Sequence, residues 1–282
     1  MQPGPDMMER SRAVILAQWE EIVRLRSEVL KTSGLEAIHD LRVASRRFRA
    51  ALGFFGPWIP GKKAAGLKKQ IRKLTRLLGR LRNSDEATLF FRVHTPNSPG
   101  GGYQICRILS ERRPDELIRI KKFLTDFDVR RSDRIVQRVV SGLQEKQLEV
   151  SGSVSLPAFF SETCTKLFQP IQELLPVVTS RENRGARHTL RIAIKKWRYF
   201  FEIAAPVLGC EVSAILSMLK EYQSTLGQMN DIAEFVSLCN SLKLSRHERT
   251  FVEATLQVED ELLLQKLTTL IEQKPLTYTC PI

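Results

Sequence analysis

Apolar residues recur along the chain at every third or fourth position, with polar residues between them, and this spacing is typical of α-helices. Strict alternation of apolar and polar residues, which is typical of half-buried strands, is nearly absent. We therefore predict an all-α protein. The expected helices span residues 7–31, 36–55, 62–82, 84–93, 103–112, 115–128, 131–149, 157–175, 184–208, 211–227, 230–242 and 246–273.

Turn-forming residues interrupt this helical pattern. Glycine, proline and small polar residues gather at 32–34, 56–61 and 94–102, and the last of these segments is expected to be a long loop. A further segment, 149–157, is poor in charge and rich in small residues. We place a domain boundary there, which gives an N-terminal half, residues 1–150, and a C-terminal half, residues 151–282.

Two blocks of sequence occur once in each half. Residues 39–49 read HDLRVASRRFR and residues 188–198 read HTLRIAIKKWR, so His, Leu, Arg, Ala and the basic positions return in register. A second block, LGRLRN at 78–83, returns as LGQMND at 226–231 with nearly the same separation. Two blocks repeated at nearly one separation indicate that the chain arose by duplication of a basic module.

Each copy of the first block forms a helix with one cationic face when it is projected at about 100° per residue. The cationic stripes consist of His39, Arg42, Arg46 and Arg49 in the first copy and of His188, Arg191, Lys195 and Arg198 in the second. The opposite faces carry Leu41, Ala44, Phe48 and Leu52, and Leu190, Ala193, Trp197 and Phe201. Since apolar faces pack into cores, we expect the function to lie on the cationic faces.

A third cationic stripe precedes the second block in the N-terminal half. It consists of Lys69, Arg72, Lys73, Arg76 and Arg80, opposite the apolar residues Leu67, Ile71, Leu74 and Leu78. Its counterpart in the C-terminal half, 211–227, retains only Lys220. The net charge of +13 is also unevenly distributed, because residues 151–282 carry as many acidic as basic residues. The excess of positive charge therefore lies in the N-terminal half. A positive field of this kind favours nucleic acid, anionic membranes or phosphate polymers as partners.

A solvated helix face is the ordinary explanation of a run of charges, and the composition of the stripes argues against it. Solvated faces usually mix both signs at i, i+4, whereas the stripes contain no carboxylate apart from Asp40. Guanidinium groups grip two phosphate oxygens at once, and lysine adds a flexible point charge. The stripes therefore predict the binding of a phosphate-rich anion.

The two histidines of the stripes allow two interpretations, which the sequence leaves open. His39 and His188 are either protonated donors to a bound phosphate or buried histidines that satisfy a neighbouring helix. Tyr199 lies near the second stripe, where its hydroxyl could donate to a phosphate.

Nucleic acid is the main competing ligand. Proteins that bind single strands place aromatic rings among their cations so that bases can stack on them. Here Phe48 and Trp197 point toward the predicted core, and only Tyr199 lies near a cationic face. Recognition of phosphate without bases therefore fits better, although sequence-nonspecific binding through the backbone of a duplex stays open.

A metal-dependent phosphohydrolase is a weaker alternative. His39 and Asp40 could ligate a metal, but only His94, His188 and His247 remain as further histidines, and the second copy replaces Asp40 by threonine. No phosphate-binding loop of the Gly-Lys-Ser/Thr type follows the glycines at 100–102. We therefore expect no catalytic residues, no metal and no cofactor.

The cysteines and the chain ends bear on the compartment. The five cysteines are scattered without metal-binding or disulfide-like spacing. The N-terminus lacks the features of a signal peptide, and no apolar run approaches the roughly 20 residues that cross a bilayer. We expect a cytoplasmic protein that is not inserted in a membrane.

The pattern His-x-Leu-Arg-(Val/Ile)-Ala-x-basic-basic-aromatic-Arg, found twice and followed each time by a Leu-Gly block, resembles the CHAD domain, the conserved histidine α-helical domain. The resemblance covers essentially the whole chain. It implies two four-helix-bundle-like halves related by a pseudo-twofold axis, with a basic groove or cavity between them. It also implies non-catalytic binding of inorganic polyphosphate, and the protein could associate with polyphosphate granules.

The resemblance also assigns ligand residues by motif position. These are His39, Arg42, Arg46, Arg47 and Arg49, and His188, Arg191, Lys195, Lys196 and Arg198. The Leu-Gly blocks depart from the family pattern, which usually ends in Arg-Asp-x-Asp, because they continue as RNSD at 82–85 and NDIA at 230–233. Some family members are fused to a triphosphate-processing domain, but its Glu-x-Glu-x-Lys signature does not occur in this chain.

Overall fold

The computed structural model describes residues 5–59, 61–94, 102–149 and 155–280, and within them the chain is entirely helical. The prediction of an all-α fold is confirmed. The elements are α1 (Pro5–Thr32), α2 (Leu35–Phe54), the short 3₁₀ helix η1 (Gly56–Trp58), α3 (Gly61–His94), α4 (Tyr103–Thr125), α5 (Val129–Glu149), α6 (Leu156–Leu174), α7 (Arg184–Leu208), α8 (Ser213–Ser241) and α9 (Arg246–Gln273).

The three predicted breaks inside helices are all wrong, and at two of them buried residues continue across the expected break. In α3, Leu81 and Ala87 lie in the core on either side of the polar residues where a break was expected. In α8, Leu226 and Met229 are likewise buried, so Gly227 lies inside a continuous helix. Burial of an apolar stripe outweighs the weak helix preference of single glycine and asparagine residues.

The third predicted break, near Pro114, is also wrong. Proline removes one backbone donor and usually ends or kinks a helix. Here Pro114 lies within α4 on its exposed side, while Leu109 and Ile120 are buried before and after it. The apolar contacts on both sides keep the two predicted segments in one helix.

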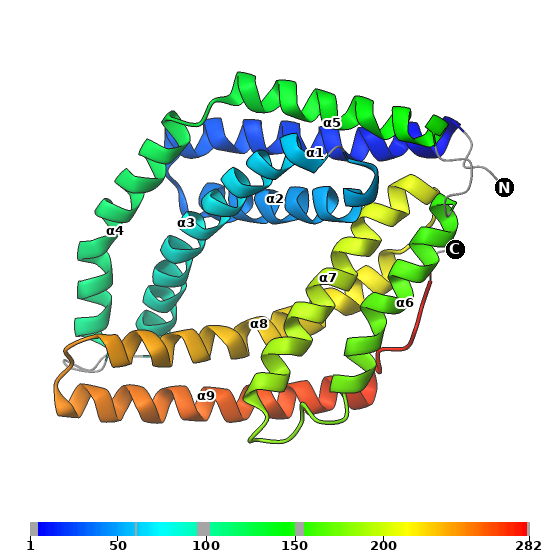
Figure 1. Cartoon of the computed structure of the whole chain (residues 1–282). Helices are drawn as coiled ribbons and strands as arrows, with labels where there is room; N and C mark the ends of the chain where they lie inside the picture. Colours follow the sequence, from blue (N-terminus) through cyan, green and yellow to red (C-terminus); the bar gives the residue numbers. More distant parts are fainter. Residues whose placement is uncertain (1–4, 60, 95–101, 150–154, 281–282) are drawn as a thin grey trace.

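The helices form an open frame with outer and inner members (Figure 1). Helices α5, α4, α9 and α6 follow the outer edges, and α2, α3, α8 and α7 lie inside them. Helix α2 contacts α7, and α3 contacts α8, so the inner helices join the two halves of the chain. These four helices carry all the cationic stripes and both Leu-Gly blocks.

The predicted apolar faces form the core. Every apolar residue placed opposite a cationic stripe is buried, from Leu41 and Leu67 to Trp197 and Phe201. The buried residues of both halves belong to one connected cluster. At the junction, the Phe54 ring lies 4.8 Å from that of Phe160, measured between centroids. Aromatic packing therefore fixes α2 against the C-terminal helices.

The domain boundary and the pseudo-twofold axis stay predictions. Residues 150–154, where the boundary was placed, and 95–101, in the expected long loop, lie outside the described residues.

Candidate functional site

The cationic stripes of α2 and α7 meet where these two helices pack together. Arg42 and Arg46 are one turn apart on α2, and Arg191 and Lys195 are one turn apart on α7. Each of the four side chains is half-buried. With Arg82 from α3 they form what we call the cation cluster, in which residues from both halves act on one another electrostatically.

The pKa values show how closely the positive charges are gathered. Burial, followed by the charges of Arg46, Arg82 and Arg191, lowers the pKa of Arg42 to about 10. Burial also lowers the pKa of Arg191. The carboxylate of Asp231 opposes this shift, and the charges of Arg46 and Arg82 act in the same direction as burial. Such crowding of like charges lowers the stability of the ligand-free protein, and an anion bound among the cations would offset their repulsion.

The arginines of the cluster are poorly compensated within the protein. Among the described residues, Arg42, Arg46 and Arg191 make no ion pair with a carboxylate, and the buried Nε atoms of Arg42 and Arg191 have no hydrogen-bond partner. Arg46 instead lies over the ring of Tyr199, with 5.7 Å between Cζ and the ring centroid. Their charge is therefore available to a ligand.

The Leu-Gly blocks lie beside the histidine blocks. A Cβ atom at Gly79 would lie 3.4 Å from the Nε atom of Arg42, so the glycine leaves room for this guanidinium against α3. In the C-terminal half, the Nδ1 atom of His188 lies 2.8 Å from the Oδ1 atom of Asn230. No atom comes within 4 Å of a Cβ placed at Gly227. The two halves thus use their Leu-Gly blocks differently.

Two predicted ligand residues are paired with a carboxylate. Arg47 donates from Nε and Nη2 to Glu202 at 2.9 and 3.2 Å, and the Nε atom of Arg198 lies 2.9 Å from the same carboxylate. Although burial opposes it, hydrogen bonding to Glu202 raises the pKa of Arg47. Glu202 follows Arg198 by one helical turn on α7. The cationic stripe of α7 therefore lacks carboxylates up to Arg198 but not beyond it.

Asp231 and Arg82 were missed by the sequence analysis as site residues. Arg82 donates to both carboxylate oxygens of Asp231 at 3.2 and 3.3 Å, which joins α3 to α8. Both residues come from the Leu-Gly blocks, whose departure from the family pattern was the available signal. Projection of single helices could not show that these two positions face each other.

The stripe on α3 adjoins the cation cluster through Arg49. Burial, followed by the charges of Arg72 and Arg46, lowers the pKa of Arg49. Lys73 lies over the ring of Phe123 at 5.3 Å from its centroid. The remaining predicted positions are exposed: His39, Lys69, Arg72, Arg76, Arg80, His188 and Lys196. Burial of His39 and His188 is therefore excluded, although His188 does contact a neighbouring helix.

The residues do not gather as a metal site would require. Among the described residues, no three His, Cys, Asp or Glu side chains are grouped so that they could hold a metal ion. His94 is engaged elsewhere, since its Nε2 atom lies 3.0 Å from Glu259 and its Nδ1 atom lies 2.9 Å from the carbonyl of Phe90. None of the described helices has the length and apolar character needed to cross a membrane.

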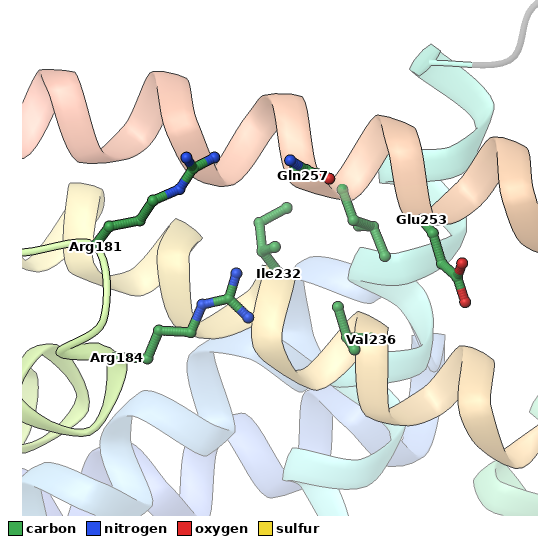
Figure 2. Close-up of a pocket in the computed structure, with 7 residues that line it drawn as sticks. Arg181, Arg184, Ile232, Val236, Glu253 and Gln257 are labelled. Carbon is green, nitrogen blue, oxygen red and sulfur yellow. The ribbon is translucent and has the colours of Figure 1, made fainter.

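A separate pocket of about 360 Å³ lies between α8 and α9 (Figure 2). Arg184 donates to Asp260 at 2.8 Å, and Arg181 donates to Glu261, so both of its arginines are paired within the protein. The pocket therefore offers less uncompensated charge than the cation cluster. Its lining residues are Arg181, Arg184, Ile232, Val236, Glu253, Leu256 and Gln257.

Comparisons with known proteins identify the fold and a family. The family model described as the CHAD domain matches residues 13–239. The crystal structure of the CHAD domain from the plant Ricinus communis is similar, with a TM-score of 0.70 and 20% identity over 99% of this chain and 95% of that chain. PptA from Streptomyces chartreusis gives a TM-score of 0.68 and 13% identity over 94% and 99% of the two chains. No curated protein matches the sequence.

Proposed function

The chain belongs to the CHAD domain family, and from this premise we propose that it binds inorganic polyphosphate, without cleaving it, on the cation cluster. Polyphosphate binding is the known role of the family. The predicted groove between the halves corresponds in this proposal to the junction of α2, α3 and α7. The stripe on α3 extends the binding surface for longer chains.

The observation that carries the proposal is the meeting, on two packed helices, of arginines that make no ion pair with a carboxylate among the described residues. Arg42 and Arg46 on α2 act on Arg191 of α7, and none of the three has a carboxylate partner among the described residues. Charge-assisted hydrogen bonds to phosphate oxygens are about twice as strong as neutral ones. A linear anion with a charge on every phosphate unit matches this spread of cations.

Nucleic acid fits this arrangement less well. The rings of Phe48 and Trp197 are fully buried, so neither can stack on a base. Tyr199 is half-buried and already lies against Arg46. The cluster offers cations without exposed aromatic rings, which favours a polyanion that has no bases.

Competition between the two polyanions tests the choice of ligand. We expect long-chain polyphosphate to displace single-stranded and duplex DNA from the protein at moderate salt, measured by fluorescence anisotropy of labelled DNA. Backbone contacts of both polymers weaken alike with salt, so the competition compares the protein's preference for the two ligands. Failure of polyphosphate to displace bound DNA would therefore contradict the proposal.

Incubation with the polymer tests the absence of cleavage. Chain length is followed on gels after incubation of polyphosphate with the protein and Mg²⁺ or Mn²⁺. We expect an unchanged length distribution. Shortening that is lost in the Arg42→Gln, Arg46→Gln, Arg191→Gln variant would show instead that the site is catalytic.

A further inference from the structure

Lys195 is the only amine in the cation cluster. It is half-buried on α7, one turn after Arg191, on the side of the helix that meets Arg42 and Arg46 of α2. Among the described residues it has no ion pair and no hydrogen-bond partner. The carboxylate of Asp231 on α8 acts on it, but this carboxylate already accepts from Arg82 of α3.

These surroundings disfavour the charged form of the amine. Burial, followed by the charges of Arg46, Arg191 and Arg42, lowers the pKa of Lys195 to about 6. An unprotonated lysine amine carries a free electron pair, and placement beside other cations is one of the ways in which proteins prepare such a nucleophile. Burial and the neighbouring guanidiniums therefore favour the unprotonated, nucleophilic form of the Lys195 amine.

We propose that Lys195 is a modification site that is acylated by acyl phosphates, whose phosphate group is held by Arg42, Arg46 and Arg191. This inference rests on the proposed function in one respect, namely that these arginines bind phosphate. The ligand class is defined by two features, a phosphate that the guanidiniums recognise and a carbonyl carbon directly attached to it through oxygen.

The chemical step requires no partner beyond the acyl phosphate. The Nζ electron pair attacks the carbonyl carbon, and a C–N bond forms. The bond between that carbon and the phosphate oxygen breaks, inorganic phosphate leaves, and the amine proton passes to water or to the leaving phosphate. Nothing is oxidised or reduced. The arginines stabilise the negative charge that builds up on the departing phosphate.

The charge balance keeps the amine reactive while an acyl phosphate is bound. One acyl phosphate brings at most two negative charges against the three guanidiniums that act on the amine, and Asp231 is paired with Arg82, so a net positive charge remains beside Lys195. A long polyphosphate chain brings many more negative charges, which favour the protonated amine and also cover it. Bound polyphosphate should therefore slow acylation of Lys195.

Acylation would weaken the binding of polyphosphate. The amide can no longer take up a proton beside a bound anion, and the acyl group occupies space among the arginines. We expect the affinity of the acetylated protein for long-chain polyphosphate to fall by about tenfold, the equivalent of one lost charge-assisted contact.

The test uses the wild-type protein, acetyl phosphate as the probe and Lys196 as an internal control. Lys196 is the next residue on the same helix and is exposed. At pH 7.5 we expect Lys195 to be acetylated about tenfold faster than Lys196, as quantified by fragment mass spectra. The rate at Lys195 should level off above about pH 7, and pyrophosphate should slow it.

A reagent without phosphate separates docking from reactivity. N-hydroxysuccinimidyl acetate should favour Lys195 over Lys196 by a smaller ratio than acetyl phosphate does. Equal rates at the two lysines with acetyl phosphate, or the same ratio with both reagents, would overturn the inference. If polyphosphate still binds in that case, the proposed function stands alone. Selective labelling without polyphosphate binding would overturn the proposed function and leave the acylation site.

Discussion

At the scale of single residues, the packing around Arg42 and Lys195 determines what the site can bind. Arg42 is half-buried beside Gly79, and Lys195 is half-buried among guanidiniums. A glycine inside a helix lowers helix stability by about 1 kcal/mol relative to alanine. At Gly79 the missing side chain leaves space for the Arg42 guanidinium. This space accounts for a glycine in the middle of α3 despite its cost in helix stability.

Substitution of Gly79 should reveal that space. Gly79→Val is expected to displace the Arg42 guanidinium and to lower polyphosphate affinity by about fivefold, the loss of part of one charge-assisted contact. Gly227→Val is the matched control, because a Cβ at that position meets no atom within 4 Å. Titration calorimetry measures both affinities. An equal loss in the two variants would contradict the role assigned to Gly79.

The pH dependence of stability should report Lys195. Since the folded protein lowers the pKa from its ordinary value of 10.5 to about 6, the unfolded chain holds more protons between these values. Stability from this group therefore rises with pH across this window and is lost as the pH falls toward 6. Urea unfolding should show that Lys195→Met stabilises the protein more at pH 6 than at pH 9, by about 3–4 kcal/mol.

Lys196→Met supplies the control for that measurement. Lys196 is exposed on the same helix, so its replacement should change stability equally at both pH values. A pH-independent effect of Lys195→Met would show that the amine of Lys195 stays charged in the folded protein.

At the scale of helices, two arginine–carboxylate contacts hold the inner helices together. Glu202 of α7 binds Arg47 of α2, and Asp231 of α8 binds Arg82 of α3. The side chain of Glu202 is only 15% exposed, and its carboxylate contacts the guanidiniums of Arg47 and Arg198. Its loss leaves both guanidiniums without their carboxylate partner. These contacts fix helix positions at the cost of local positive charge.

Glu202→Gln should therefore separate stability from binding. We expect the free energy of unfolding to fall by about 1–3 kcal/mol, because a half-buried ion pair is broken. Polyphosphate affinity should rise severalfold, since Arg47 and Arg198 become available and one negative charge is removed. Denaturation and titration of the same preparation measure both effects.

Glu221→Gln is the matched control for Glu202→Gln. Glu221 binds Lys274 at 2.7 Å on the surface, with an exposed fraction of 44%, and its replacement removes the same charge. Surface pairs contribute little to stability, so neither property should change appreciably. A similar gain in affinity from both variants would show that only the net charge matters.

The helical pattern could be predicted at this scale because it depends on local spacing, and the bounds of α7 and α9 agree with the expected 184–208 and 246–273. The contacts of Glu202 and Asp231 could not, because they depend on how α2 meets α7 and α3 meets α8. Projection of one helix identifies a cationic face but does not show which opposite charges a second helix brings to it. Motif position alone assigned Arg47 to the ligand residues, and nothing in the sequence showed that it pairs with Glu202.

At the scale of the whole molecule, the central claim is that polyphosphate recognises a place in the fold and not merely the net charge of +13. Cations also occur far from the cluster. Arg130, Arg134 and Arg138 form an exposed row at i, i+4, i+8 spacing on α5, which lies on an outer edge of the frame (Figure 1). A nonspecific polyanion binder would use both rows.

The most direct measurement compares two triple variants of equal charge by titration with long-chain polyphosphate at moderate salt. Replacement of Arg42, Arg46 and Arg191 by glutamine should lower the affinity by at least about 100-fold, while replacement of Arg130, Arg134 and Arg138 by glutamine should lower it by less than about threefold. Both variants should retain the helical content of the wild type in circular dichroism. Equal losses of affinity would contradict the assignment of the cation cluster as the binding site.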